Sequence, residues 1–163
     1  MTDQEASVAR RLRELSIAYE RYEHPPAATV EDAAPHWAHI DATHCKNLFL
    51  RNQKGNRHYL AIVQASKRVD LRKLADQIGD GKLSFASPER LMALLGLMPG
   101  SVSPFGLIND RNHAVRVYLD RDLKLAERLT FHPNINTVTY VVSAADFARF
   151  LDASGHIVRY VTV

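Results

Sequence analysis

The sequence predicts an α+β fold, with a mixed, largely antiparallel sheet curled into a partial barrel and helices flanking it. Three observations predict it: a hairpin pattern near residue 50, four strand-like segments between residues 107 and 143, and helices marked at both ends by capping residues. The length of 163 residues and the 46% hydrophobic content suit one domain, residues 1–163, with a real core.

The first 40 residues predict two helices and a short strand. Thr2 and Glu5 fit a capping box ahead of apolar residues spaced on one helical face. The alternation in "IAYERYEH" predicts a strand. The segment "TVEDAAPHWAHI" predicts a second helix, with Thr29 as N-cap and Pro35 as an interruption.

Two strands, "KNLFLRN" and "HYLAIVQA", are separated by the polar, glycine-containing loop "QKGN", which predicts a hairpin. Side chains alternate along a strand, so Lys46 and Leu48 share one face while Asn47 and Phe49 share the other. Because both faces carry apolar residues, we expect the first strand to be central. Lys46 heads that strand in this interpretation.

The remaining elements follow from their boundaries. Helices are predicted for "DLRKLADQIG", closed by Gly79, and for "SPERLMALLG", with Ser87 as N-cap. The segment "MPGSVSPFG" predicts a loop, after which strands are expected at "LIND", "VRVYLD", "LTFHP" and "NTVTYVVS". A helix from Ser143 to Gly155, with Asp146 completing its box, precedes a terminal strand in "HIVRYVTV".

Composition narrows the class of protein. The net charge of +3 is compatible with phosphate contacts without requiring them. A single cysteine, Cys45, excludes a disulfide within the chain and suits a reducing compartment. The start of the chain lacks the apolar core of a signal peptide, and no apolar run approaches the ~20 residues that span a bilayer. We therefore expect a cytoplasmic protein without membrane contact.

Several residues invite chemical hypotheses that the pattern alone leaves weak. Cys45 as a nucleophile with His44 as its base is disfavoured, because neighbours on a strand point to opposite faces. Residues 36–44 hold three histidines and an aspartate (His36, His39, Asp41, His44), but no HExxH or paired cysteines accompany them, so we expect no metal. Basic residues between Arg51 and Arg72 suggest a nucleic-acid patch, without the interleaved aromatics of an RNA-recognition sheet.

Two further segments remain open on pattern alone. The loop "PGSVSP" is able to aim backbone N–H groups at one oxygen, of a phosphate or of an ester's developing oxyanion, but it also fits an ordinary connection. His132 stands at a strand end before Pro133, where it fits either a hydrogen-bonding role or a sheet edge.

Four segments, in this order, resemble one family. They are "HPPAATVEDA", "HCKNLFLRN", "LSFASPERLMALLGLMPGSVSPFGLIND" and "FHPNINTVT". The sequence resembles the YbaK-like, prolyl-tRNA-synthetase-associated editing domains through nearly its whole length. It is most similar to the freestanding branch that includes the alanyl-prolyl-tRNA deacylases, which implies the YbaK fold and hydrolysis of the ester on a mischarged tRNA.

The resemblance also implies the site. The family's strand lysine and its neighbour match Lys46 and Asn47, and the late histidine matches His132. The G-x-x-x-P loop matches Gly100, Ser101, Val102, Ser103 and Pro104, and the early threonine segment matches Thr29 and Val30. Lys46 and His132 are then catalytic and the others bind substrate, with no cofactor and no metal. The implied partners are the acceptor end of tRNA and prolyl-tRNA synthetase, with monomer and homodimer both open.

Three alternatives stay beside this reading. A non-catalytic tRNA- or DNA-binding module would bind with strong salt dependence and no turnover. A deacylase for another small amino acid, such as cysteine, would share the site but differ in pocket volume. A cysteine hydrolase would be sensitive to thiol reagents, whereas we expect Cys45→Ser to remain active.

Overall fold

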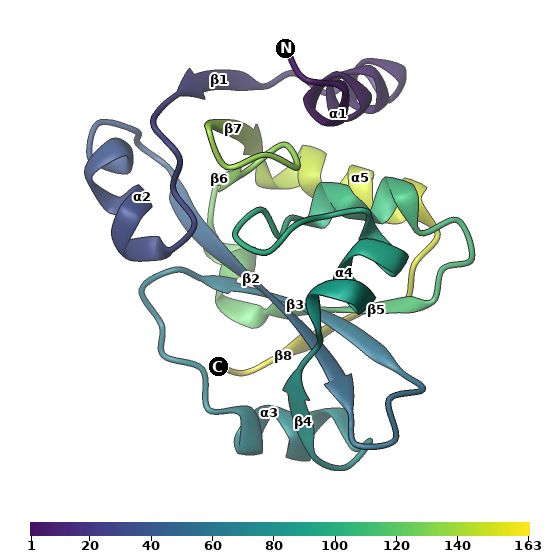
Figure 1. The fold of residues 1–163 in the computed structure, drawn as a ribbon. Coiled ribbons are helices and arrows are strands. Elements are labelled where there is room, and N and C mark those ends of the chain that lie inside the picture. Colours follow the sequence, from purple (N-terminus) through teal and green to yellow (C-terminus); the bar gives the residue numbers. More distant parts are fainter.

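The structure, a computed structural model, describes all 163 residues (Figure 1). Its helices are α1 (Asp3–Glu14), α2 (Val30–Trp37), α3 (Leu71–Ile78), α4 (Pro88–Leu95) and α5 (Ala144–Ser154), with 3₁₀ helices η1 (Pro104–Asn109) and η2 (Arg121–Leu125). Its strands are β1 (Glu20–Glu23), β2 (Thr43–Asn52), β3 (His58–Gln64), β4 (Leu83–Phe85), β5 (Val115–Asp120), β6 (Arg128–Phe131), β7 (Val138–Ser143) and β8 (Val158–Val161).

All eight strands belong to one sheet of order β1-β7-β6-β2-β3-β5-β8, and β4 pairs with β2 beside this path. Four of the strand pairs are antiparallel (β1–β7, β2–β3, β2–β4 and β6–β7), and three are parallel (β2–β6, β3–β5 and β5–β8). The predicted α+β class with a mixed, largely antiparallel sheet is confirmed. The sheet is open, since β1 and β8 end it at opposite sides, and does not close into a barrel.

Strand β2 is central, as predicted, but its two edges differ. One edge pairs with β3 from Cys45 to Arg51. The other edge pairs with β6 only at Thr43 and His44, and with β4 only from Leu50 to Asn52. Residues 45–49 therefore have no strand neighbour on this second edge, and the candidate site lies at this gap.

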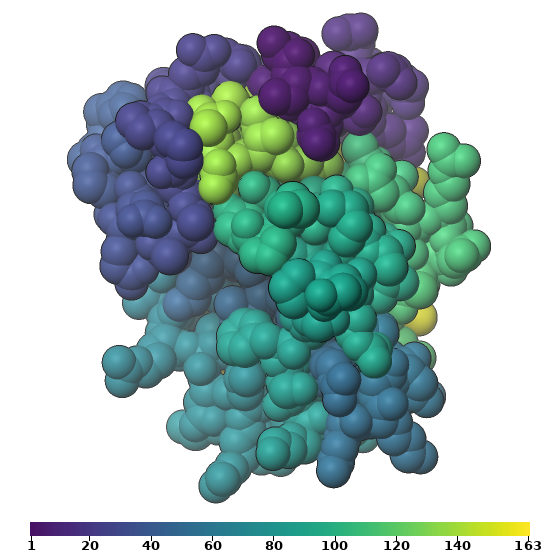
Figure 2. Space-filling model, in the orientation of Figure 1, coloured from purple at the N-terminus to yellow at the C-terminus, as the bar shows by residue number.

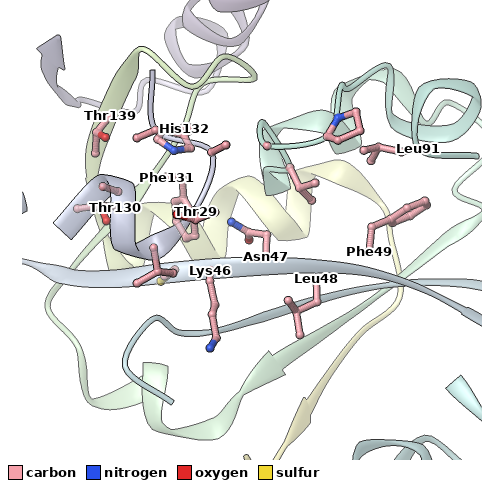
Figure 3. Close-up of a pocket in the computed structure, with 18 of the residues that line it drawn as sticks. Thr29, Lys46, Asn47, Leu48, Phe49, Leu91, Thr130, Phe131, His132 and Thr139 are labelled. Atoms are coloured by element: carbon pink, nitrogen blue, oxygen red, sulfur yellow. The ribbon is translucent and has the colours of Figure 1, made fainter. Parts of the chain in front are cut away.

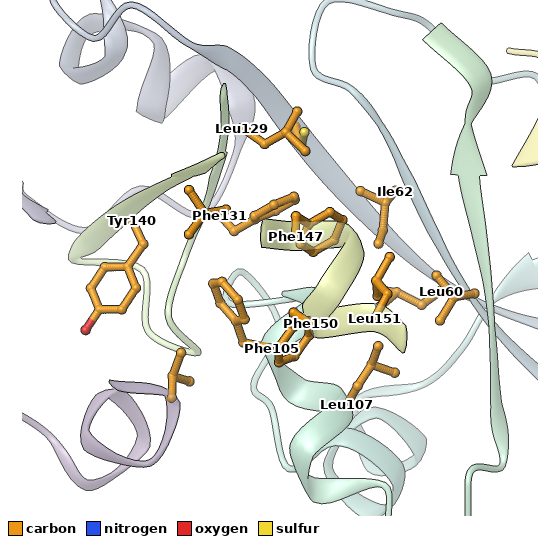
Figure 4. Close-up of a cluster of buried hydrophobic side chains, with 14 of the residues drawn as sticks. Leu60, Ile62, Phe105, Leu107, Leu129, Phe131, Tyr140, Phe147, Phe150 and Leu151 are labelled. Carbon is orange, nitrogen blue, oxygen red and sulfur yellow. The ribbon is translucent and has the colours of Figure 1, made fainter. Parts of the chain in front are cut away.

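The two faces of β2 bury separate hydrophobic clusters. Cys45 and Phe49 belong to the larger cluster, in which Phe105, Phe131, Phe147 and Phe150 pack between the sheet, η1 and α5 (Figure 4). Leu50 belongs to a smaller cluster that is covered by α3, and Leu48 packs against it. The predicted alternation of side chains along this strand is thus confirmed.

The predicted helix boundaries rest on the expected capping groups. Thr29 forms a complete capping box with Asp32, and Ser87 and Ser143 accept hydrogen bonds from N–H groups three residues ahead. At α1 only half of the predicted box forms. Thr2 accepts from the Glu5 N–H, but the Glu5 carboxylate is directed inward to other partners.

Four further sequence expectations are wrong. The "LIND" segment ends η1 rather than forming a strand, because buried Ser103 and Pro104 start a 3₁₀ helix there. Pro35 does not interrupt α2, which loses one N–H donor and continues for two residues. Strand β2 begins at Thr43, so Lys46 is its fourth residue and not its head. Asp146 does not complete a box, because its carboxylate accepts hydrogen bonds from Arg149.

Candidate active site

A pocket of about 320 Å³ opens at the gap in β2. In Figure 2 it is the hollow between the violet-blue α2 segment and the teal segment that carries α4 and the loop after it, with blue atoms of β2 at its floor. Thirteen of its 22 lining residues are hydrophobic. The named lining residues are Ala27, Ala28, Thr29, Val30, Ala33, Trp37, Cys45, Lys46, Asn47, Leu48, Phe49, Phe85, Ala86, Pro88, Leu91, Pro99, Gly100, Val102, Thr130, Phe131, His132 and Thr139.

Thr29 and Val30, which the family resemblance implied as substrate-binding residues, lie in the wall of this pocket. The Thr29 hydroxyl accepts a hydrogen bond from the Asp32 N–H at 3.1 Å, so it holds the start of α2 in place. The capping box thereby fixes the position of the wall against the pocket. Thr29 therefore contributes to the site by fixing the start of α2.

Asn47 points from β2 into the pocket, toward the side where His132 lies (Figure 3). Its Oδ1 is buried and has no hydrogen-bond partner in the chain. A buried amide without a partner loses about 1–3 kcal/mol of hydrogen bonding that water would supply. The pocket therefore presents an amide whose hydrogen-bonding capacity is left for a ligand.

Lys46 contributes to the lining but directs its ammonium group to the opposite face of β2 (Figure 3). There it donates a hydrogen bond to the Lys67 carbonyl. Alternation along the strand separates this ammonium group from the Asn47 amide. A role at the substrate requires Lys46 to leave the Lys67 carbonyl, so its catalytic role stays a prediction.

The loop of residues 100–104 divides into lining and supporting residues. Gly100 and Val102 line the pocket, whereas Ser101, Ser103 and Pro104 are buried outside its lining. The N–H groups of Gly100 and Val102 donate to no group in the chain, while the Ser101 N–H donates to the Met98 carbonyl. Two unpaired donors therefore lie at the pocket wall.

Gly100 allows this loop to approach the segment before α2. Its φ is +84°, and a Cβ added there would lie 2.9 Å from the Ala28 Cβ. A side chain at this position would thus combine left-handed backbone strain with a steric overlap. The close approach explains why glycine stands at this position.

His132 follows β6 and is held by a hydrogen bond from Nδ1 to the Val138 carbonyl, at 2.8 Å. Burial lowers its pKa more than the carbonyl raises it, so the imidazole is neutral at neutral pH. Because a carbonyl only accepts, Nδ1 carries the proton in the bond to Val138, and the Ala27 carbonyl is a second group near the ring that raises its pKa. His132 therefore lines the pocket as a buried, neutral imidazole.

Comparison with known families adds to this geometry. Residues 24–150 match the family described as the aminoacyl-tRNA editing domain. The chain belongs to the aminoacyl-tRNA editing family. The match includes Asn47, His132 and the whole loop of residues 100–104, so the pocket lies within the family domain.

Relatives of this editing domain support the assignment. The chain is 40% identical over 158 residues to the "Prolyl-tRNA editing protein ProX" of Acetoanaerobium sticklandii, and the aligned region covers 94% of each chain. It is 34% identical over 155 residues to the mouse "Prolyl-tRNA synthetase associated domain-containing protein 1", covering 93% of this chain and 91% of the mouse protein. A shorter match, 32% over 97 residues, reaches the Escherichia coli "Multifunctional Ser/Thr-tRNA deacylase ProXp-y", covering 58% of this chain and 54% of that protein.

The fold of the editing family is also shared. A solved structure, described as that of a proposed trans-editing enzyme for prolyl-tRNA synthetase, superposes with a TM-score of 0.75. It is 24% identical and covers 100% of this chain and 99% of its own. Together with the family match, these relatives make the chain an aminoacyl-tRNA hydrolase that acts on tRNA.

Sequence reasoning missed part of this editing pocket. Trp37 stacks on His44 with ring centroids 4.5 Å apart, and His44 Nδ1 is 2.9 Å from the Thr130 hydroxyl. Both Trp37 and Thr130 line the pocket. They come from α2 and β6, which are more than 80 residues apart in the sequence. No local sequence pattern therefore predicts that they line the same pocket.

The other chemical hypotheses do not gather into sites in the editing domain. Burial raises the pKa of the Cys45 thiol, which keeps it protonated and unsuited to nucleophilic attack. The histidines and aspartate of residues 36–44 form no cluster able to hold a metal ion. In the suggested basic patch, Arg57 pairs with Asp80, and Lys67 pairs with Asp120 and Asp122. No helix of the structure is long and apolar enough to cross a membrane.

Proposed function

We propose that this editing enzyme hydrolyses the ester that joins alanine, wrongly attached, to tRNA for proline. One observation carries the proposal: the unpartnered Asn47 amide and the neutral His132 imidazole flank one end of a largely apolar pocket. A small apolar amino acid with a polar ester end matches this distribution of groups.

The chemistry fits hydrolysis without a covalent intermediate. Water attacks the ester carbonyl carbon and gives up a proton, and the π electron pair of the C=O bond moves to its oxygen. Collapse of this oxyanion re-forms the C=O bond and breaks the bond to the ribose oxygen, which takes the proton, so that alanine and a free ribose hydroxyl are the products. The unpaired N–H groups of Gly100 and Val102 support the oxyanion. The neighbouring ribose hydroxyl helps to activate the water, so the substrate provides part of the mechanism.

The remaining site residues bind the substrate in this proposal. Lys46 leaves the Lys67 carbonyl and turns toward the pocket, where it binds the terminal nucleotide. Asn47 orients the aminoacyl group, and His132 shapes the amino-acid pocket beside it. Thr29 and Val30 form the opposing wall. Ser101, Ser103 and Pro104 hold the loop in position beneath Gly100 and Val102.

Size explains why alanine is the proposed substrate. Alanine is smaller than proline, so a synthetase pocket built for proline excludes it poorly. A second pocket that admits alanine and refuses proline corrects that error. The name of the Acetoanaerobium sticklandii relative, a prolyl-tRNA editing protein, supports the same tRNA here.

The proposal also concerns where and with whom the enzyme acts. Prolyl-tRNA synthetase is the proposed partner, since it produces the mischarged tRNA, and the family names of relatives point to it. A cytoplasmic location accompanies the proposal because translation uses charged tRNA there. Monomer and homodimer both remain compatible with it.

The test is hydrolysis of alanyl-tRNA for proline, compared with correctly charged prolyl-tRNA, by wild type and by Lys46→Ala. We expect rapid loss of alanine only, and its abolition by the substitution. Seryl and cysteinyl esters on the same tRNA are the controls for pocket volume. If the alanyl ester is hydrolysed only at its spontaneous rate while one of the controls is cleaved faster, the amino acid of that control is the substrate instead of alanine.

A further inference from the structure

The gap in β2 leaves both main-chain groups of Asn47 without a partner. Along a paired strand, successive residues direct their N–H and C=O groups to alternate edges. The His44 carbonyl accepts from the Ala65 N–H on the β3 side, and the Phe49 carbonyl accepts from the Ala86 N–H on the other side. Asn47 lies two residues before Phe49, so its N–H and C=O groups are directed to the same edge as those of Phe49 and point into the gap.

Nothing in the chain fills that gap. The ladder with β6 ends at His44, and the ladder with β4 begins at Leu50. The main-chain hydrogen bonds outside regular elements include none from or to Asn47. Asn47 is half-buried at the pocket wall, so its main-chain donor and acceptor are left to pair with a ligand that enters the pocket.

The groups opposite this edge belong to the same pocket. Gly100 and Val102 bring their unpaired N–H groups from the loop, and His132 brings its imidazole from the end of β6. The pocket thus has main-chain donors on two sides, with the Asn47 carbonyl as an acceptor. An aminoacyl ester complements these groups, because its carbonyl oxygen accepts hydrogen bonds and its α-ammonium group donates them.

We propose that the aminoacyl group of the substrate pairs with this edge as one added strand residue. Its α-ammonium group donates to the Asn47 carbonyl, and its ester carbonyl oxygen accepts from the Asn47 N–H. The N–Cα–C=O unit of an amino acid is the repeat of a polypeptide, so its spacing matches a hydrogen-bonded antiparallel pair. This inference rests on the proposed function and names main-chain contacts that no side-chain motif encodes.

Pairing has a consequence for recognition of the substrate. The contacts read the part that all amino acids share, so they hold the ester in place without selecting alanine. Selection is left to the pocket walls on either face of the added residue. The α-amino group becomes a required part of the substrate, because a charged donor makes the stronger of the two hydrogen bonds.

The test is nuclear magnetic resonance of ¹⁵N-labelled protein with 3′-alanylamido-3′-deoxyadenosine, in which an amide replaces the ester. We expect the Asn47 main-chain proton to shift downfield on binding and to exchange more slowly with solvent. The matched 3′-propionylamido compound, which lacks the α-amino group, binds about tenfold to a hundredfold more weakly. In Asn47→Ala the side chain is lost, yet the residue-47 N–H still responds.

Other outcomes overturn the inference in distinguishable ways. Shifts confined to Gly100 and Val102 would assign the carbonyl to the loop alone. Equal affinity for the two compounds would show that the α-ammonium group makes no contact with the Asn47 carbonyl. An active enzyme that bound neither compound would contradict the pairing, since the alanylamido compound keeps both the α-ammonium group and the carbonyl. A wild type unable to hydrolyse alanyl-tRNA would instead refute the proposed function.

Discussion

At the scale of single residues, His132 links the pocket to pH. Its pKa is lowered by burial, so the imidazole stays neutral at and somewhat below the ordinary histidine pKa of about 6.5. If neutral His132 is needed, the ratio of enzymatic to spontaneous hydrolysis is flat around neutral pH. It falls only as the pH drops through the lowered pKa and Nε2 becomes protonated. A pH series from 4.5 to 8.5, in ~0.5-unit steps across that range, measures this fall.

Two variants separate His132 from the other histidines. We expect His132→Gln to be slow at every pH and to lack the acid fall, because an amide does not titrate there. His39, whose ring packs on Tyr22 outside the pocket lining, provides the matched control, and His39→Gln should keep the wild-type profile. An acid fall that persists in His132→Gln would assign the titration to another group.

At the scale of elements, Ser103 illustrates a site residue that acts through structure. It is fully buried, and its hydroxyl accepts from the Phe105 N–H at 3.1 Å at the start of η1. We predict that Ser103→Ala lowers the free energy of unfolding by about 1–2 kcal/mol through the lost cap. Hydrolysis by the folded variant should stay near the wild-type rate, because Ser103 is absent from the pocket lining.

Denaturant unfolding and hydrolysis measured at the same temperature check both halves of this prediction. Ser103→Thr, which keeps the hydroxyl, should recover part of the stability. A variant of wild-type stability with impaired hydrolysis would place Ser103 in contact with substrate instead.

The loop before η1 carries a second prediction, at Gly100. We expect Gly100→Ala to impair hydrolysis, since its Cβ would overlap Ala28 across the pocket wall and displace the loop donors. The left-handed backbone adds about 1–2 kcal/mol of strain. Gly79 is the matched control: its φ is +79°, but nothing lies within 4 Å of an added Cβ.

Comparison of the two alanine variants separates strain from overlap. Gly79→Ala should lose a similar amount of stability, measured by denaturant unfolding, and keep normal hydrolysis. Gly100→Ala should lose activity beyond what its stability explains. Equal activity in the two variants would show that the close approach to Ala28 has no role in the site.

Most elements were predictable because their signals are local. The caps at Thr29, Ser87 and Gly96 and the alternation of β2 depend on neighbouring residues, and the structure has them all. The short strand β4 was missed because three residues carry too little pattern. The pattern of the loop of residues 100–104 left its role open until the family resemblance was considered, and its division into lining and supporting residues needed coordinates.

At the scale of the whole molecule, a buried carboxylate joins distant segments. Glu5 of α1 is 1% exposed and accepts hydrogen bonds from Arg21 on β1, at 2.6 Å, and from Tyr140 on β7, at 3.0 Å. Burial opposes its ionisation, but the hydrogen bonds from Arg21 and Tyr140 outweigh burial and lower its pKa. Three elements at one end of the sheet are thereby connected (Figure 1).

We predict that Arg21→Ala lowers the free energy of unfolding by about 3 kcal/mol at neutral pH, because it leaves a buried charge without its partner. The lowered pKa stabilises the wild type at neutral pH, and this contribution is lost as the pH falls through it. The difference between the two proteins should therefore shrink in acid.

Denaturant unfolding at neutral and acid pH measures this difference. Arg11 pairs with Glu14 on the exposed face of α1, and Arg11→Ala should change stability by at most about 1 kcal/mol. A deficit in Arg21→Ala that is independent of pH would point to lost packing rather than to the charge of Glu5.

The stacked pair of Trp37 and His44 has a practical consequence. Trp37 is the single tryptophan of the chain, and it lies in the wall of the pocket. Its fluorescence therefore comes from the site alone, and a ligand that displaces water from the indole or moves its imidazole neighbour alters the emission. Occupancy of the pocket can be followed by light in the unlabelled, unmodified protein.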